Sequence, residues 1–72
     1  MPSTETTRPV MLVVEDESET RALIRGELER RYGSDYRVSC EGSALAALTK
    51  LERWRADGQP VALVLADQWM PD

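Results

Sequence analysis

The segment VMLVVEDE, residues 10–17, decides how this sequence is expected to fold. Its first five residues are apolar and mostly β-branched, which is typical of a strand buried on both faces of a parallel sheet. The next three residues are Glu15, Asp16 and Glu17, so the apolar run ends abruptly in acid. We therefore expect a central strand whose carboxyl end carries a cluster of carboxylates.

Two helices and two further strands are predicted after this segment. A first helix is expected from about Ser18 to Tyr32, before the turn-forming sequence Gly33-Ser34-Asp35. A second should begin after Gly42-Ser43 and end at Asp57-Gly58. Strands are predicted at Tyr36–Cys40, near a sheet edge, and at Val61–Ala66, as a buried strand. The predicted apolar stripes of the helices are Leu23, Ile24, Leu28 and Tyr32 in the first, and Ala44, Leu45, Leu48, Leu51 and Trp54 in the second.

Strands that alternate with helices of this length indicate right-handed crossovers and an α/β fold with a parallel sheet. In such sheets the functional crevice lies at the carboxyl ends of the strands. The third predicted strand also runs directly into an acid, Asp67. The acids that follow the two most apolar strands should therefore share one rim of the sheet.

Composition and charge exclude several classes of protein. A chain of 72 residues with a formal net charge of −4 has room for one small domain and lacks a basic nucleic-acid-binding surface. It has no histidine and one cysteine, Cys40, which excludes histidine triads, histidine metal sites and an internal disulfide. No apolar run approaches the roughly 18 residues of a membrane span, and residues 1–9 are expected to form a disordered polar tail, not a secretory signal. These features predict a cytoplasmic location without membrane contact.

The acids at the predicted rim point to a metal site. Two unit charges ~4 Å apart repel by about 4 kcal/mol at an effective dielectric of ~20, so clustered carboxylates are unfavourable by themselves. A magnesium ion removes this repulsion and prefers oxygen ligands, which makes Glu15, Asp16 and Asp67 candidate ligands. Other interpretations stay open, because acids after a strand often cap the next helix, as we expect for Glu17, and Asp67 alone could begin a turn.

The chain from Val10 onwards resembles the receiver domains of bacterial two-component response regulators. The resemblance rests on VVEDE at 13–17, ALIRGEL at 22–28, Ala44-Leu45 on the second helix, and DQWMP at 67–71 after the third strand. A pair of acids after one strand and D-x-x-M-P after another, in this order and at this separation, is a specific signal. The resemblance implies a flavodoxin-like, doubly wound parallel sheet in the order 2-1-3, with residues 10–72 as part of a receiver domain.

The resemblance also implies roles for individual residues. Asp67 would accept a phosphoryl group from a phosphohistidine on a partner sensor histidine kinase. Asp16 would bind Mg²⁺ (or Mn²⁺) directly, Glu15 would act through a water molecule, and Trp69 would contribute its backbone carbonyl. The family commonly has Asp at the position of Glu15, and the longer carboxylate can still reach a bound water. Met70-Pro71 would shape the loop, and the protein would be a phosphorelay component, not a conventional enzyme.

A whole receiver has five strand and helix units, and the resemblance covers two units plus the third strand. The family places a Ser or Thr on the fourth strand and a Lys on the fifth, both in contact with the phosphoryl group, and nothing in this sequence matches them. Lys50, the only lysine, and its neighbour Thr49 fall on the second predicted helix. Phosphoryl transfer to Asp67 in this chain is therefore expected to be slow or undetectable.

A finer and weaker likeness concerns one subgroup of receivers. Residues 31–38 and 58–68 are similar to receivers joined to thioredoxin-reductase-like flavoproteins. The Gly42-Ser43 connection is shorter than in that subgroup, and Trp69 stands where a basic residue is often seen. The likeness therefore suggests a possible fusion partner and no flavin site in these residues.

The sheet order implied by the resemblance places the first strand between the other two. Val61–Ala66 would then lie at an edge, where its six apolar or small residues have no neighbour. Open apolar edges recruit other chains. We therefore expect self-association, either by pairing of third strands or by exchange of an element between copies.

Three competing interpretations stay open. Phosphatases of the haloacid dehalogenase type also use a strand-end Asp with magnesium, but they have a second Asp two residues later, where this chain has Trp69. The chain could instead be a receiver-like interaction or assembly module that is never phosphorylated. It could also be a generic α/β segment whose acids only lie in solvent, and indifference to magnesium and to Asp67→Asn would favour that interpretation.

Overall fold

A computed structural model describes residues 8–66 of the chain, and residues 1–7 and 67–72 lie outside the described part. Its three strands are parallel and lie in the order β2-β1-β3, with two helices between them in the sequence. The predicted α/β class and the strand order 2-1-3 are confirmed, and this arrangement is consistent with flavodoxin-like and Rossmann-like folds. The elements are β1 (Val10–Val14), α1 (Ser18–Tyr32), β2 (Arg37–Glu41), α2 (Ala44–Asp57) and β3 (Val61–Ala66).

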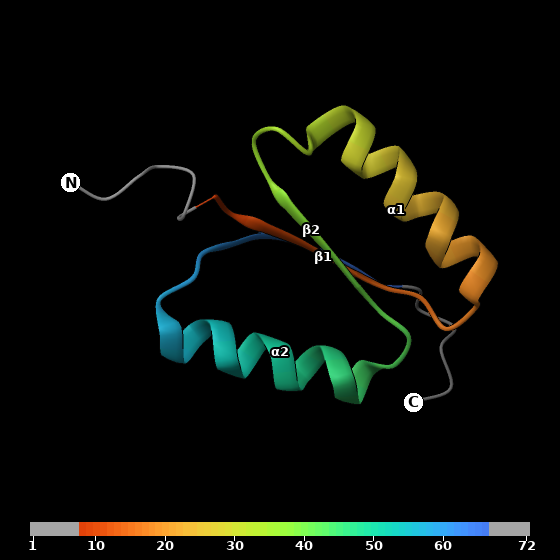
Figure 1. The fold of residues 1–72 in the computed structure, drawn as a ribbon. Helices are drawn as coiled ribbons and strands as arrows, with labels where there is room; N and C mark the ends of the chain where they lie inside the picture. Colours follow the sequence, from red (N-terminus) through yellow and green to blue (C-terminus); the bar gives the residue numbers. More distant parts are fainter. Residues whose placement is uncertain (1–7, 67–72) are drawn as a thin grey trace.

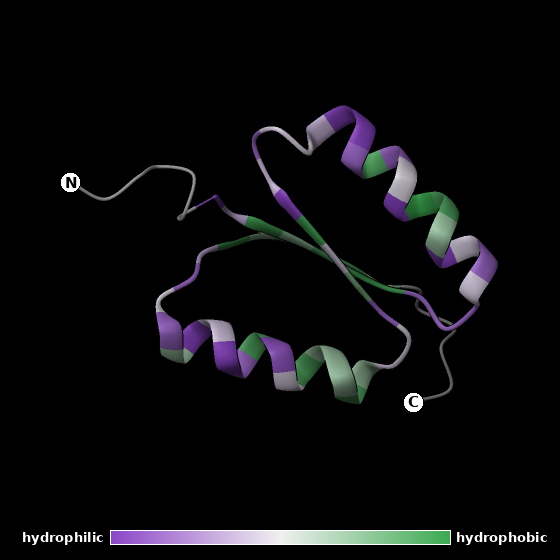
Figure 2. Ribbon diagram, viewed as in Figure 1, coloured by the Kyte–Doolittle hydropathy of each residue, from purple (hydrophilic) through white to green (hydrophobic). Residues whose placement is uncertain are grey.

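The core is built around β1, the middle strand, whose five residues are all buried. Val10, Leu12 and Val14 point to one face and pack against Ala47 and Trp54 of α2. The alternate residues Met11 and Val13 point to the opposite face, where α1 lies. Figure 1 shows the two helices on opposite sides of the sheet, and Figure 2 shows the apolar residues of the strands lying between them. The crossover from β1 to β2 and the crossover from β2 to β3 run in opposite directions across the sheet. Because both are right-handed, α1 and α2 lie on opposite faces.

The starts of both helices and the end of α2 are fixed by residues that the sequence pattern indicated. Glu17 is the N-cap of α1 and accepts a hydrogen bond from the backbone N–H of Thr20 (3.1 Å). Ser43 is the N-cap of α2 and accepts from the N–H of Ala46 (3.1 Å). Gly58 ends α2 with a φ of +74°, in the left-handed region where glycine is the least strained residue. The predicted extents of both helices are confirmed.

The predicted apolar stripe of α2 was wrong for two leucines. Leu45 and Leu48 are 72% and 56% exposed, and the buried residues of α2 are Ala47 and Trp54, with Leu51 partly buried beside them. Apolar residues occupy two flanks of this helix, so periodicity alone does not determine which flank faces the sheet. Ala47 has a small side chain and packs with Trp54 against the residues of β1. On α1, which has no buried residue, Leu23 and Tyr32 of the predicted stripe are likewise exposed (75% and 41%).

The two outer strands also differ from the prediction. The second strand begins and ends one residue later than expected, at Arg37 and Glu41. The backbone N–H of Tyr36 closes a turn on the carbonyl of Tyr32 (2.9 Å), so Tyr36 precedes the strand. β3 has the predicted bounds, but it is largely exposed, not buried. It pairs with β1 on one side and has no strand on its other side within residues 8–66.

The residues that lead into β1 are bonded to the rest of the fold. The Nη1 atom of Arg8 donates to the carbonyl of Gly33 (2.8 Å), and the N–H of Arg37 donates to the carbonyl of Pro9 (2.9 Å). Most of the predicted tail, residues 1–7, lies outside the described part. Neither α1 nor α2 is long and apolar enough to cross a membrane.

Candidate functional site at the carboxyl ends of the strands

The register of the sheet brings the ends of its strands to one rim. Val14, the last residue of β1, pairs with Ala66, the last residue of β3, and with Glu41, the last residue of β2. The N–H of Glu15 donates to the carbonyl of Glu41 (2.9 Å), which extends the contact with β2 one step beyond β1. The described part of β3 therefore ends level with the start of the acidic segment, and Asp67 is the next residue in the sequence.

Glu15 is half-buried, and its polar groups bond to the start of α1. Its Oε2 atom accepts from the backbone N–H of Glu17 (3.1 Å), and its backbone carbonyl accepts from Nη1 of Arg21 (2.9 Å). The bond to Glu17 holds the carboxylate at the turn between β1 and α1. A carboxylate has about four acceptor positions, so the one bond found for it among residues 8–66 leaves capacity for a further ligand.

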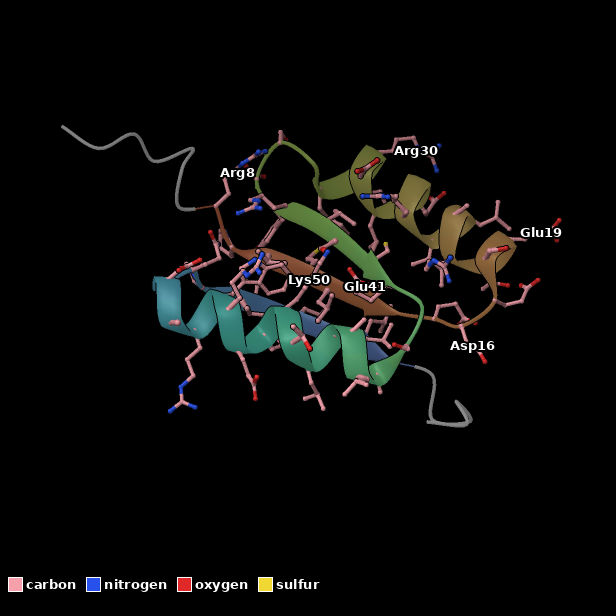
Figure 3. All side chains as sticks on the ribbon, turned by 60° about the horizontal axis from the view of Figure 1, so that its bottom comes forward. Arg8, Asp16, Glu19, Arg30, Glu41 and Lys50 are labelled. Carbon is pink, nitrogen blue, oxygen red and sulfur yellow. The ribbon has the colours of Figure 1, made fainter. Side chains whose placement is uncertain are left out.

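Asp16 lies in the same turn and is exposed. Figure 3 shows it beside the first turn of α1, at the opposite end of the sheet from Arg8. Asp16 therefore offers oxygen atoms to solvent at the rim where a ligand would approach. Glu15 and Asp16 are adjacent in the chain and differ in burial. The half-buried, hydrogen-bonded Glu15 suits an anchored role, and the exposed Asp16 suits direct coordination of a cation.

Glu17 belongs to the helix and not to the site. Hydrogen bonds from the hydroxyl and then the N–H of Thr20 hold the pKa of the Glu17 carboxyl below its usual range. The negative charge also lies at the positive end of the α1 dipole. The prediction that Glu17 caps the helix is confirmed.

Arg21 is a residue of this rim that sequence reasoning missed. Besides its bond to the carbonyl of Glu15, its guanidinium lies over Gly42, where a Cβ atom would be 2.9 Å from Nη1. Gly42 thus leaves the space that the Arg21 side chain occupies. No spacing rule predicts this contact, because it depends on the path of the β2–α2 connection.

Lys50 and Thr49 are engaged on α2. The Nζ atom of Lys50 lies 2.5 Å from a carboxylate oxygen of Glu41, donates to the hydroxyl of Ser39 (2.9 Å) and lies 5.9 Å from the ring centroid of Trp54. Figure 3 shows Lys50 and Glu41 pointing toward each other. The hydroxyl of Thr49 donates to the carbonyl of Leu45 (3.1 Å).

The fit of the site to a divalent cation is partial within residues 8–66. No group of three metal-ligating side chains gathers in that range. Glu15 and Asp16 supply two carboxylates at a partly exposed rim, which suits a hard cation that keeps several of its waters. The other predicted ligands, Asp67 and the carbonyl of Trp69, lie outside the described residues, as does the predicted loop Met70-Pro71.

Comparison of the chain with protein-family models, with curated proteins and with solved structures gave no match. The fold and the geometry of the rim are therefore the observations on which a functional proposal rests.

Proposed function

We propose that this chain is a phosphoacceptor receiver module of a two-component phosphorelay in the cytoplasm. In this proposal Asp67 takes a phosphoryl group from a phosphohistidine of a partner sensor histidine kinase, and residues 10–72 form part of a receiver domain. The observation that carries the proposal is the register of β1 with β3, in which Val14 pairs with Ala66. It supports a common position for Asp67 and for the acids that follow Val14.

The proposed transfer uses a carboxylate nucleophile and charge stabilisation, and we expect it to be slow in residues 1–72, where nothing matches the hydroxyl and the lysine that receivers place on the phosphoryl group. An oxygen of Asp67 forms a bond to phosphorus while the bond from phosphorus to the imidazole nitrogen breaks, so an acyl phosphate forms and the imidazole leaves with a proton. Asp16 and Asp67 would hold Mg²⁺ directly, Glu15 through water, and Trp69 through its carbonyl. The bound ion would supply charge neutralisation to the transferring group. Arg21 holds the Glu15 backbone in place at this rim.

A second function is favoured by a different observation. The exposed apolar side chains of β3 fit a receiver-like assembly module that acts without phosphorylation. Such a module would keep the strand order and the association surface but would not need a cation at the rim. The two functions are separated by the response of the fold to magnesium.

The test is the thermal stability of the chain with and without Mg²⁺. A ligand present at ten times its Kd stabilises the folded state by about 1.4 kcal/mol, which for a domain of this size raises Tm by roughly 5–10 °C. We expect this rise in the unmodified protein and its loss in Asp67→Asn and Asp16→Asn.

The matched control is Asp35→Asn, which removes the same charge from the turn between α1 and β2, at the other end of the strands. Asp35→Asn should respond to Mg²⁺ as the unmodified protein does. An equal rise in Tm for Asp67→Asn would contradict the proposed site, and no rise in any of the proteins would favour the assembly module.

A further inference from the structure

An open cavity lies at the end of the sheet opposite the candidate functional site. Its volume is about 510 Å³, and its wall is formed by Arg8, Glu29, Gly33, Tyr36, Arg37 and Val38. Figure 3 shows Arg8 at the end of the sheet away from Asp16. Small-molecule sites commonly have volumes of about 300–1,000 Å³, so the cavity has room for a small organic ligand.

Arg8 is held in the wall of this cavity by its backbone and by its side chain. Its carbonyl accepts from Nε2 of Gln59 (2.7 Å), and its Nη1 atom donates to the carbonyl of Gly33 (2.8 Å). The carbonyl of the next residue, Pro9, accepts from the N–H of Arg37 (2.9 Å). The Arg8 side chain is therefore already ordered before a ligand arrives, which lowers the entropic cost of binding.

The positive charge of Arg8 has no counterion within the described residues. Among residues 8–66, no carboxylate forms an ion pair with Arg8 or Arg37. Glu29, the one acid of the wall, is paired with Arg25 instead (3.6 Å). The Nε atom of Arg8 is also buried without a hydrogen-bond acceptor. Because buried charges and donors are normally paired, this guanidinium favours an anion from outside the chain.

Arg37 brings a second positive charge to the same end of the sheet. Its Nη1 atom donates to Oε1 of Gln59 (3.1 Å), and the Nε2 atom of the same amide donates to the carbonyl of Arg8. Gln59 thus ties the two arginines together. A guanidinium has five N–H donors, and the described residues accept from one nitrogen of each arginine, so most donors stay available to a ligand.

We propose that this cavity binds an organic phosphate monoester. Its phosphate group carries a charge of about −1.5 to −2 at pH 7, which matches two guanidinium groups better than the single charge of a carboxylate does. Arginine also bonds phosphate through two parallel N–H donors. The half-buried Tyr36 and Val38 offer the rest of the cavity to the organic part. The proposal is independent of phosphorylation at Asp67.

NMR titration with phenyl phosphate tests the proposal. The Nε–H resonance of Arg8 and the amide resonances of Tyr36 and Val38 should shift and saturate. Benzoate has the same ring but one charge, so it should bind about tenfold more weakly, as expected when one charge-assisted interaction is lost. A chain with a net charge of −4 does not attract anions by its overall field, so saturable binding requires a local site.

Two variants locate the bound phosphate. Arg8→Gln removes a charged donor and should weaken phenyl phosphate binding about tenfold or more. Because Arg8→Gln also removes the bond to Gly33, Arg37→Gln is the second variant. Arg37 is exposed, so Arg37→Gln should stay folded and still weaken binding. Circular dichroism checks the fold of both variants.

The matched control is Arg53→Gln, which removes the same charge from an exposed position of α2, on the other face of the sheet. It should bind phenyl phosphate as the unmodified protein does. Unchanged binding in both Arg8→Gln and Arg37→Gln, an equal loss in Arg53→Gln, or equal affinity for benzoate would overturn the proposal. Binding that appears only in Glu5→Gln would also overturn it, because an acid of the chain itself would then be the anion.

Discussion

Glu15, Asp16 and Glu17 are neighbours in the chain but lie in three different environments. The Glu15 carboxylate bonds to the backbone of Glu17, Asp16 faces solvent, and the Glu17 carboxylate closes the first turn of α1. The sequence predicted the cap, because capping is a local signal. It did not predict the bond of Glu15 to Glu17 or the approach of Arg21, because both depend on side-chain conformations in the folded turn.

The Glu17 cap predicts a pH dependence of stability. Because hydrogen bonds from Thr20 lower the pKa of the Glu17 carboxyl, this group stabilises the fold above its unfolded pKa, and the contribution is lost as pH falls through the lowered folded pKa. Glu17→Gln should therefore destabilise the protein at pH 7 and have less effect at pH 3. Urea unfolding at the two pH values measures this difference.

The control for this experiment is Glu19→Gln, which removes the same charge from the same turn. Its effect should depend less on pH than that of Glu17→Gln, since only Glu17 is the N-cap. A loss of stability in Glu17→Gln that is the same at both pH values would show that the charged form of the cap does not matter.

At the scale of the element, α2 shows what periodicity can and cannot predict. Its start at Ser43 and its end at Gly58 follow from residues whose conformational preferences act locally. The rotation of α2 about its own axis does not follow from local preferences. Leu45 and Leu48 extend the apolar pattern beyond the flank of α2 that is buried. Which flank of α2 packs against β1 is a property of the packed helix and sheet, and the sequence pattern does not contain it.

Two glycines of the helices predict opposite effects of the same substitution. A Cβ atom at either Gly26 or Gly58 would have no neighbour within 4 Å, so neither change causes a clash. Gly26 lies inside α1, where Gly26→Ala should stabilise by roughly 0.5–1 kcal/mol. Gly58 has φ +74°, so Gly58→Ala should destabilise by about 1 kcal/mol. Urea unfolding of both variants checks the signs, and a common sign would contradict the assigned backbone conformation.

At the scale of the whole molecule, the order of the elements was predictable and the burial of β3 was not. A continuous apolar run indicates a strand in the middle of a sheet, and this holds for β1, which has neighbours on both sides. The run in β3 looks the same, yet only β1 pairs with it within residues 8–66. Periodicity describes one strand at a time, so it carries no information on the number of neighbours.

The proposed function requires that the acids following β1 and β3 meet at one rim and hold a divalent cation. The most direct measurement is the broadening of backbone amide resonances by substoichiometric Mn²⁺, which acts on nuclei close to the bound ion. We expect the amides of Glu15, Asp16 and Asp67 to broaden together, while those of Arg37 and Gly58, at the other end of the strands, stay sharp. Broadening of Glu15 and Asp16 that leaves Asp67 sharp would contradict it.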